Sequence, residues 1–177
     1  MKITISGFPG SGKTTVGKIV AKELGYEFIS VGEMRRKFAF KKEMSILDYN
    51  KQKKDVDTEF DNFQKKYGKT HDNFILDGRL SFHFVPDSIK IFFKVELSKA
   101  AERIFKNQRK SENKYNSIDD AKKNIKERIQ QDHNRYFKLY GLDIFNFNNF
   151  DLIIDTTSLT IEEVKERVIN YVKSFLD

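Results

Sequence analysis

The sequence has no cysteine and no tryptophan, and only two prolines, in its 177 residues. Without cysteine the chain can form neither a disulfide framework nor a thiolate zinc site. The three histidines, His71, His83 and His133, are too scattered to make a convincing metal cluster. We therefore expect any metal ion to arrive with a substrate.

Long apolar runs are also missing. No stretch approaches the roughly 20 apolar residues that cross a bilayer, and the opening MKITISGFPGSGKTT lacks the apolar core of a signal peptide. We expect a cytoplasmic protein with no membrane partner. With 38% hydrophobic residues, and with no repeat, proline-rich linker or Gly/Ser run, the chain reads as a single domain over residues 1–177.

Positive charge is unevenly distributed along the chain. Lys and Arg number 33 against 26 Asp and Glu, which gives a formal net charge of +7. Residues 1–98 carry +5, residues 99–138 carry +6, and residues 139–177 carry −4. An anionic partner is therefore favoured, and the charge alone does not choose between a nucleotide, a nucleic acid and an anionic membrane.

Short apolar runs alternate with helical patterns along the whole chain. The runs are nearly continuous rather than alternating, which is typical of strands buried on both faces of a parallel sheet. The sequence therefore predicts an α/β fold with a doubly wound, five-stranded parallel sheet and helices on both faces. The expected strands are Lys2–Ser6, Tyr26–Ser30, Asn73–Asp77, Ile89–Val95 and Asp151–Asp155. The expected helices are Lys13–Leu24, a pair across about 33–67, Ser98 to about Arg109, Ile118 to about Tyr140, and Ile161–Phe175, the last with a Thr160/Glu163 capping box.

A phosphate-binding motif follows the first expected strand. Gly7-Phe8-Pro9-Gly10-Ser11-Gly12-Lys13-Thr14 fits the pattern G-x-x-x-x-G-K-[ST] and leads into the first expected helix. Backbone N–H groups of the loop and the helix dipole would face phosphate together. Lys13 would reach the terminal phosphates and the Thr14 hydroxyl would bind Mg²⁺. A chance match in a chain of this length has a probability on the order of one per cent, so we assign this segment, with Thr15, to ATP.

The acceptor must be inferred from other segments. Ser30-Val31-Gly32-Glu33-Met34-Arg35-Arg36 follows the second strand and could form a second anion pocket. Taken alone, these residues fit a Ser cap and a solvated basic turn slightly better. The third strand ends in Asp77-Gly78-Arg79, where a carboxylate beside the P-loop could hold Mg²⁺; strand-Asp-Gly is also a common start of a turn.

The order of these three segments resembles that of nucleoside monophosphate kinases, and the chain looks most like the archaeal-type cytidylate kinases from Ile3 to Asp155. The resemblance implies the P-loop kinase fold with helical insertions, one for the monophosphate at residues 33–68 and a lid region at about 103–135. It implies that Arg36 grips the monophosphate, that Asp77 organises Mg²⁺, and that Arg79 contacts the acceptor. Ser30, Gly32 and Gly78 belong to the same acceptor segments.

The basic segment contains a helical stripe formed by Arg128, Asp132 and Arg135. On their own, residues with this spacing fit an ordinary salt-bridged helix face better. Cytidylate kinases carry the same Arg-x-x-x-Asp-x-x-Arg stripe after the lid, and this resemblance implies that both arginines bind the transferring phosphates while Asp132 contacts the nucleoside. Arg103 matches the first lid arginine, near the donor. Asn107 stands where related kinases often place another arginine, a role that Arg109 or Lys106 could cover; His133 fits a surface helix position.

We therefore expect ATP-dependent phosphorylation of a nucleoside monophosphate, CMP or dCMP, to the diphosphate. Lys13, Arg79, Arg128 and Arg135 would carry catalysis by positioning and charge neutralisation, with no general base. We expect a monomer whose partners are small nucleotides. The alternatives are a kinase for AMP, UMP or a small metabolite such as shikimate, and a nucleic-acid-binding ATPase. The last is disfavoured because the sequence shows no nucleic-acid recognition motif.

Overall fold

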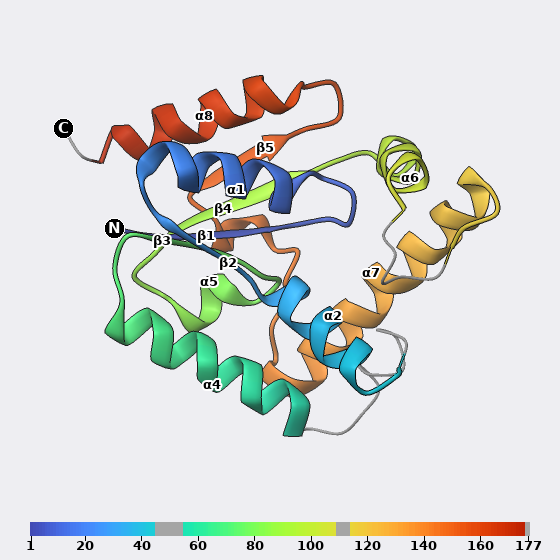
Figure 1. The fold of residues 1–177 in the computed structure, drawn as a ribbon, viewed down its shortest axis with the longest axis horizontal. Coiled ribbons are helices and arrows are strands. Elements are labelled where there is room, and N and C mark those ends of the chain that lie inside the picture. Colours follow the sequence, from blue (N-terminus) through green and yellow to red (C-terminus); the bar gives the residue numbers. More distant parts are fainter. Residues whose placement is uncertain (45–54, 109–113, 176–177) are drawn as a thin grey trace.

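The computed structural model describes residues 1–44, 55–108 and 114–175, and the side chains of 55–57 are not considered. Within this part of the chain all five expected strands form one parallel sheet in the order β2-β3-β1-β4-β5, which confirms the predicted fold class (Figure 1). The strands are β1 Lys2–Gly7, β2 Glu27–Ser30, β3 Phe74–Asp77, β4 Ile89–Lys94 and β5 Leu152–Asp155.

Helices connect the strands close to the predicted positions. They are α1 Lys13–Leu24, α2 Val31–Lys41, α4 Asp55–Thr70, α5 Ser81–Phe84, α6 Leu97–Lys106, α7 Ile118–Tyr140 and α8 Ile161–Lys173, with a 3₁₀ turn at Phe147–Asn149. The expected capping box of Thr160 and Glu163 is present at α8. The helix α2 begins before Glu33 because Ser30 caps it, and the four-residue α5 was too short for its pattern to predict.

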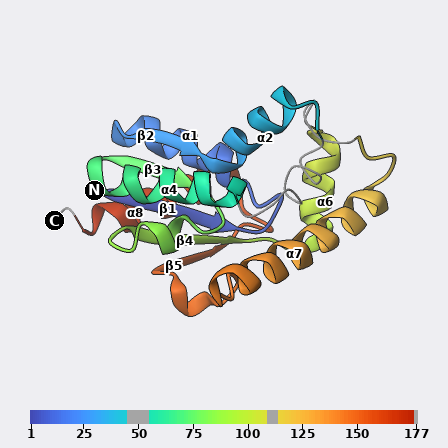
Figure 2. The same ribbon diagram turned by 90° about the horizontal axis from the view of Figure 1, so that it is seen from below.

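Side chains alternate between two apolar layers, one on each face of the sheet. Ile5 and Ile75 face α1 and α8, where they pack in one buried cluster with Val20 and Val168. On the opposite face Phe92 packs in a cluster with residues of α5 and α7, and Phe74 and Leu76 pack in another with residues of α2 and α4. Figures 1 and 2 show these layers, with α6 and the N-terminal part of α7 packed together beyond one end of the sheet.

The strand register brings the polar strand ends into one row. Ser30 at the end of β2 lies opposite Asp77 of β3, and Asp77 lies opposite Ile5 of β1, two residues before the phosphate loop begins. Parallel strands end at the same edge, so side chains from three separate parts of the sequence meet there. None of the helices in the described ranges is long and apolar enough to cross a membrane.

The predicted insertions at 33–68 and about 103–135 fall partly outside the described residues. Residues 45–54 and 109–113, including Arg109, are not described. Within the described part, most of α2 and α4 lies in the first range, and the C-terminal part of α6 and most of α7 lie in the second. The division into a single domain with these two insertions stays a prediction.

Candidate active site

The loop between β1 and α1 folds around the ammonium group of Lys13. Lys13 Nζ donates to the carbonyl oxygens of Gly7 at 2.9 Å and Phe8 at 2.7 Å. Gly10 and Gly12 have φ angles of +77° and +88°, in the left-handed region that glycine adopts at little cost. A Cβ atom at Gly10 would also lie 2.8 Å from the carbonyl oxygen of Ala100 in α6. The loop shape and its close packing on α6 therefore both require glycine.

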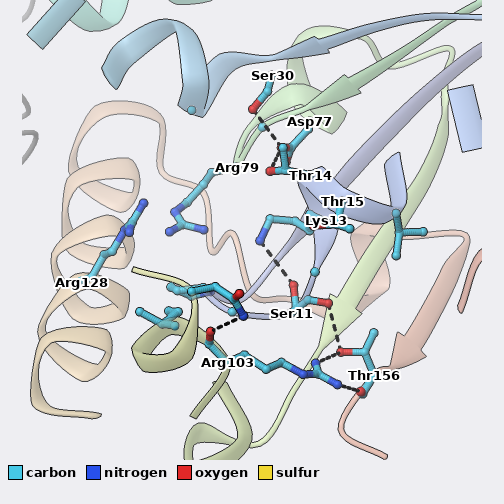
Figure 3. A pocket seen from close by; sticks show the side chains of 18 of the residues that line it. Ser11, Lys13, Thr14, Thr15, Ser30, Asp77, Arg79, Arg103, Arg128 and Thr156 are labelled. Atoms are coloured by element: carbon cyan, nitrogen blue, oxygen red, sulfur yellow. Dashed lines mark hydrogen bonds between the residues drawn. The ribbon is translucent and has the colours of Figure 1, made fainter. Parts of the chain in front are cut away.

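Asp77 accepts hydrogen bonds from two hydroxyl groups at the sheet edge. Its Oδ2 atom accepts hydrogen bonds from Thr14 Oγ1 at 2.7 Å and from Ser30 Oγ at 2.9 Å, and the residue is buried (Figure 3). Hard oxygen donors of this kind suit Mg²⁺, which keeps several waters and takes further ligands from substrate phosphates. The described residues contain no group of three or more acidic, His or Cys side chains that could hold a metal alone. The Thr14 hydroxyl and the Asp77 carboxylate are oxygen donors of the kind that suits Mg²⁺.

Arg79 links the phosphate loop to α7. Its Nε atom donates to Asp132 Oδ2, and its Nη1 atom donates to the carbonyl oxygen of Gly7 at 3.1 Å. The Asp132 side chain is buried against this guanidinium. Two residues that the sequence separates by 53 positions, both expected to serve the acceptor, thus form an ion pair directly beside the loop.

The start of α2 carries the residues predicted for the acceptor. Ser30 Oγ accepts a hydrogen bond from the backbone N–H of Glu33 at 3.3 Å, so Ser30 caps the helix, as the simpler interpretation predicted. The same hydroxyl group also donates to Asp77. Arg35 and Arg36 are not a solvated basic turn, since both are buried. The Arg35 guanidinium lies 4.7 Å from the centre of the Phe60 ring. Arg35, for which the sequence predicted no role of its own, lines the same cavity as Arg36.

The cavity enclosed by these elements has a volume of about 610 Å³. Helix α7 supplies Arg128, Asp132 and Arg135 to its wall, and Figure 3 shows Arg128 projecting toward the side where Arg79 and Lys13 lie. The basic lining residues are Lys13, Arg35, Arg36, Arg79, Arg103, Arg128 and Arg135; the acidic ones are Asp77 and Asp132. This excess of positive charge suits a polyphosphate. From the P-loop segment, Pro9 to Thr15 line the cavity, as do Ser30, Gly32 and Gly78.

Two expected positions differ in detail. The ring of Phe8 points away from the cavity and packs on Phe92 and Phe145, with ring centres 5.4 Å and 5.1 Å away, so only its backbone faces Lys13. His133 lies on α7 outside the cavity lining, and it is half-buried because its ring stacks on the rings of Phe137 and Phe145.

Two residues of the predicted lid region line the cavity. Arg103 lines the cavity while its guanidinium donates to the Thr156 carbonyl oxygen at 2.7 Å. Asn107 also lines the cavity, and its side chain donates to the Arg103 carbonyl oxygen at 3.1 Å.

Sequence reasoning missed several lining residues. Tyr136 follows Arg135, whose guanidinium lies 4.5 Å from the centre of the Tyr136 ring. Thr156, Leu159 and Val164 also line the cavity. Thr156 directly follows the fifth strand, so the rule that ligands bind at the carboxyl edge of a parallel sheet could have indicated it.

Comparison with known proteins identifies the family of the chain. The family model described as the cytidylate kinase-like family matches residues 2–158. The chain belongs to this family. The family is one of nucleoside monophosphate kinases, so the chain is an enzyme of that kind.

Three relatives illustrate the range of the family. The chain is 34% identical to a cytidylate kinase of Methanobrevibacter smithii over 98% of this chain and 99% of that protein. It is 35% identical to a cytidylate kinase of Archaeoglobus fulgidus over 98% of this chain and 95% of the relative. It is also 36% identical, over 96% of its length, to an S-adenosylmethionine-dependent nucleotide dehydratase of Lacinutrix mariniflava, of which it spans only 35%.

Solved structures share the fold at lower identity. A crystal structure of a protein from Eubacterium ventriosum has a TM-score of 0.76 at 16% identity and covers 98% of this chain and 99% of that chain. Shikimate kinase from Bacteroides thetaiotaomicron has a TM-score of 0.65 at 15% identity, with 98% of both chains covered. At these identities the likeness concerns the fold alone.

Proposed function

We propose that this member of the cytidylate kinase-like family transfers the γ-phosphoryl group of ATP to CMP or dCMP. The observation that carries the proposal is that one cavity joins a phosphate loop to a second buried arginine site. Lys13 lies on the donor side, Arg36 on the acceptor side, and Arg79 and Arg128 line the same cavity. The similarity to two archaeal cytidylate kinases over nearly their whole length supports the choice of CMP.

The transfer needs little covalent chemistry from the protein. A terminal oxygen of the acceptor phosphate attacks the γ-phosphorus and forms a new P–O bond. The bond from that phosphorus to the bridging oxygen of the β-phosphate breaks, and ADP leaves with the electron pair. The acceptor phosphate is mostly dianionic at neutral pH, so no general base is required. Lys13, Arg79, Arg128 and Arg135 would hold the reacting groups and offset the charge on the transferred oxygens.

Thr14 and Asp77 would hold Mg²⁺ at the sheet edge, while Ser30 orients the Asp77 carboxylate. When bound, Mg²⁺ offsets negative charge on the donor phosphates. Arg36 and the start of α2 would hold the acceptor phosphate. Because water could compete as acceptor, we expect the elements around the cavity to close only when both substrates are bound.

An acceptor panel tests the proposal. The purified protein with ATP and Mg²⁺ is offered CMP, dCMP, UMP, AMP and shikimate in turn, and ADP release is measured with and without each compound. We expect the highest kcat/KM with CMP or dCMP. A higher value for any other acceptor would overturn the assignment.

The P-loop lysine provides the companion test. Because Lys13 would neutralise negative charge on the terminal phosphates during transfer, Lys13→Ala is expected to reduce transfer by at least about a hundredfold, while the thermal midpoint stays close to that of the unaltered chain. Full activity in this variant would contradict the catalytic assignment. We further propose that the chain acts as a monomer on free nucleotides. Tight, salt-dependent binding of RNA or DNA with no stimulation by monophosphates would favour the alternative of a nucleic-acid-binding ATPase.

A further inference from the structure

Thr156 is a buried residue to which the proposed chemistry assigns no role. It directly follows β5, is 1% exposed, and lines the cavity at its donor end. Its Oγ1 atom lies 3.1 Å from the carbonyl oxygen of Ser11 in the phosphate loop and 2.9 Å from that of Lys94 at the end of β4. Arg103 Nη1 donates to the same oxygen at 3.2 Å (Figure 3). One hydroxyl group thus joins the phosphate loop, the central sheet and α6.

The chemistry of a hydroxyl decides the direction of these bonds. Threonine has one O–H proton and two acceptor lone pairs. Arg103 can only donate, so it occupies a lone pair of Thr156 Oγ1. The Lys94 carbonyl already accepts the backbone N–H of Thr156 at 2.9 Å. A carbonyl oxygen has two lone pairs, so the Lys94 oxygen can share the hydroxyl proton with the Ser11 oxygen. Because the backbone N–H of Thr156 already binds Lys94, the hydroxyl adds most to the position of Ser11, and Arg103 helps to hold it in that orientation.

Anchoring the Ser11 carbonyl also orients the next N–H group. The Ser11 carbonyl and the Gly12 N–H belong to one peptide unit, which is planar and trans, so they point in opposite directions. When Thr156 draws the Ser11 oxygen toward the sheet, the Gly12 N–H is turned away from Thr156. Backbone N–H groups of this loop are the donors that hold phosphate in the P-loop motif.

A second contact reinforces the same coupling. Gly10 packs directly on Ala100, and Ala100 and Arg103 lie three residues apart on one face of α6. The loop is therefore held on α6 at two places, once by backbone packing and once through the hydroxyl of Thr156. This leaves the Ser11–Gly12 peptide little freedom to rotate.

We propose that Thr156 is a positioning residue of the donor site: its hydroxyl group holds the Ser11 carbonyl and thereby aims the Gly12 N–H at the donor phosphates. This inference rests on the proposed use of the loop for a nucleoside triphosphate. It is independent of which acceptor the enzyme uses, since it concerns donor binding alone.

The test is ATP binding in the absence of any acceptor, measured by isothermal titration calorimetry with Mg²⁺ for the full chain. Thr156→Val keeps the shape and removes the hydroxyl, and Thr156→Ser keeps the hydroxyl and removes the methyl group. Loss of one hydrogen bond predicts a Kd for ATP about five- to tenfold higher in Thr156→Val. The Kd in Thr156→Ser is expected within about twofold of the unaltered chain, even where its thermal midpoint falls.

Thr157→Val is the matched control, because its hydroxyl bonds to Asp155 at 2.6 Å and the residue is half-buried outside the phosphate loop. We expect it to lose stability without a change in ATP affinity. Magnesium tripolyphosphate is the second probe. Since it has no base, its binding reports on the phosphate-binding groups alone. In Thr156→Val its Kd should rise by the same factor as the Kd for ATP.

Three outcomes would overturn the proposal. Equal ATP affinity in Thr156→Val and the unaltered chain would exclude a role in donor binding. Equal weakening in Thr156→Ser and Thr156→Val would show that the methyl packing matters and not the hydroxyl. A raised Kd for ATP with an unchanged Kd for tripolyphosphate in Thr156→Val would place the effect at the base and not at the phosphates. Absence of ATP binding in the unaltered chain would instead contradict the proposed function itself.

Discussion

Gly32 offers a test in which stability and acceptor binding should change in opposite directions. It is the second residue of α2, and it lines the acceptor side of the cavity. A Cβ atom there would lie 3.4 Å from Arg36 Nη1 and 3.8 Å from both Arg36 Nη2 and Ser30 Oγ. These are ordinary contact distances, so Gly32→Ala should be accommodated in the free protein.

The two effects have separate physical causes. Alanine costs less backbone entropy than glycine in a helix, by about 0.5–1 kcal/mol, which for a chain of this size corresponds to a rise of about 1–4 °C in the thermal midpoint. The new methyl group would occupy the space beside the Arg36 guanidinium, where an acceptor phosphate oxygen must approach to accept a hydrogen bond. Displacing that phosphate by about 1 Å predicts a loss of tenfold to a hundredfold in kcat/KM for the acceptor.

The assay combines thermal unfolding with steady-state kinetics in which CMP and ATP are varied separately. The KM for ATP serves as the internal control, since the methyl group lies on the acceptor side. We expect a higher midpoint, a raised KM for CMP and an unchanged KM for ATP. An unchanged KM for CMP would refute the assignment of Gly32 and Arg36 to the acceptor phosphate. A lowered midpoint would refute the packing argument.

Two further predictions concern charge. Arg36→Lys keeps the charge but loses the bidentate fork, so the KM for CMP should rise about tenfold with a smaller change in kcat; equal KM values would contradict a direct phosphate contact. Burial, with the nearby charge of Lys65, lowers the pKa of His83 below its ordinary value. The unfolded chain therefore takes up a proton first, and stability is lost as pH falls below about 6.5. The thermal midpoint of His83→Gln should fall less steeply over that range, whereas His71→Gln, at an exposed site, serves as the control; parallel slopes in all three proteins would exclude His83 as a source of the loss.

Local patterns were sufficient to predict much of the site. The P-loop is a continuous segment whose glycines, lysine and threonine lie within one turn of the chain. Its role could therefore be predicted from residues that are neighbours in the sequence. The boundaries of α1 and α7 agree with the prediction because Gly25 and Gly141 end these helices with φ angles of +69° and +66°. The buried strands were predicted because a parallel sheet covered on both faces demands continuous apolar runs.

Contacts between distant segments could not be predicted in the same way. Phe8 lies within the P-loop motif, yet its ring stacks on Phe145, which in turn stacks on His133. Asp61 of α4 accepts a hydrogen bond from Tyr140 of α7, and no sequence pattern pairs these two residues. Such pairs depend on how helices pack on the sheet, and the sequence pattern of either partner is compatible with many neighbours.

By itself the sequence determined the class of fold, the phosphate loop and the residue types available for nucleotide chemistry. Each of these follows from short-range patterns: apolar runs, helix caps and a glycine-rich turn. Only the tertiary structure decided that Arg35 is buried beside Arg36, that Arg79 pairs with Asp132, and that Thr156 reaches Ser11. The physical reason is that a parallel sheet collects the carboxyl ends of strands far apart in the sequence at one edge, so the partners of each polar group are set by register and helix packing.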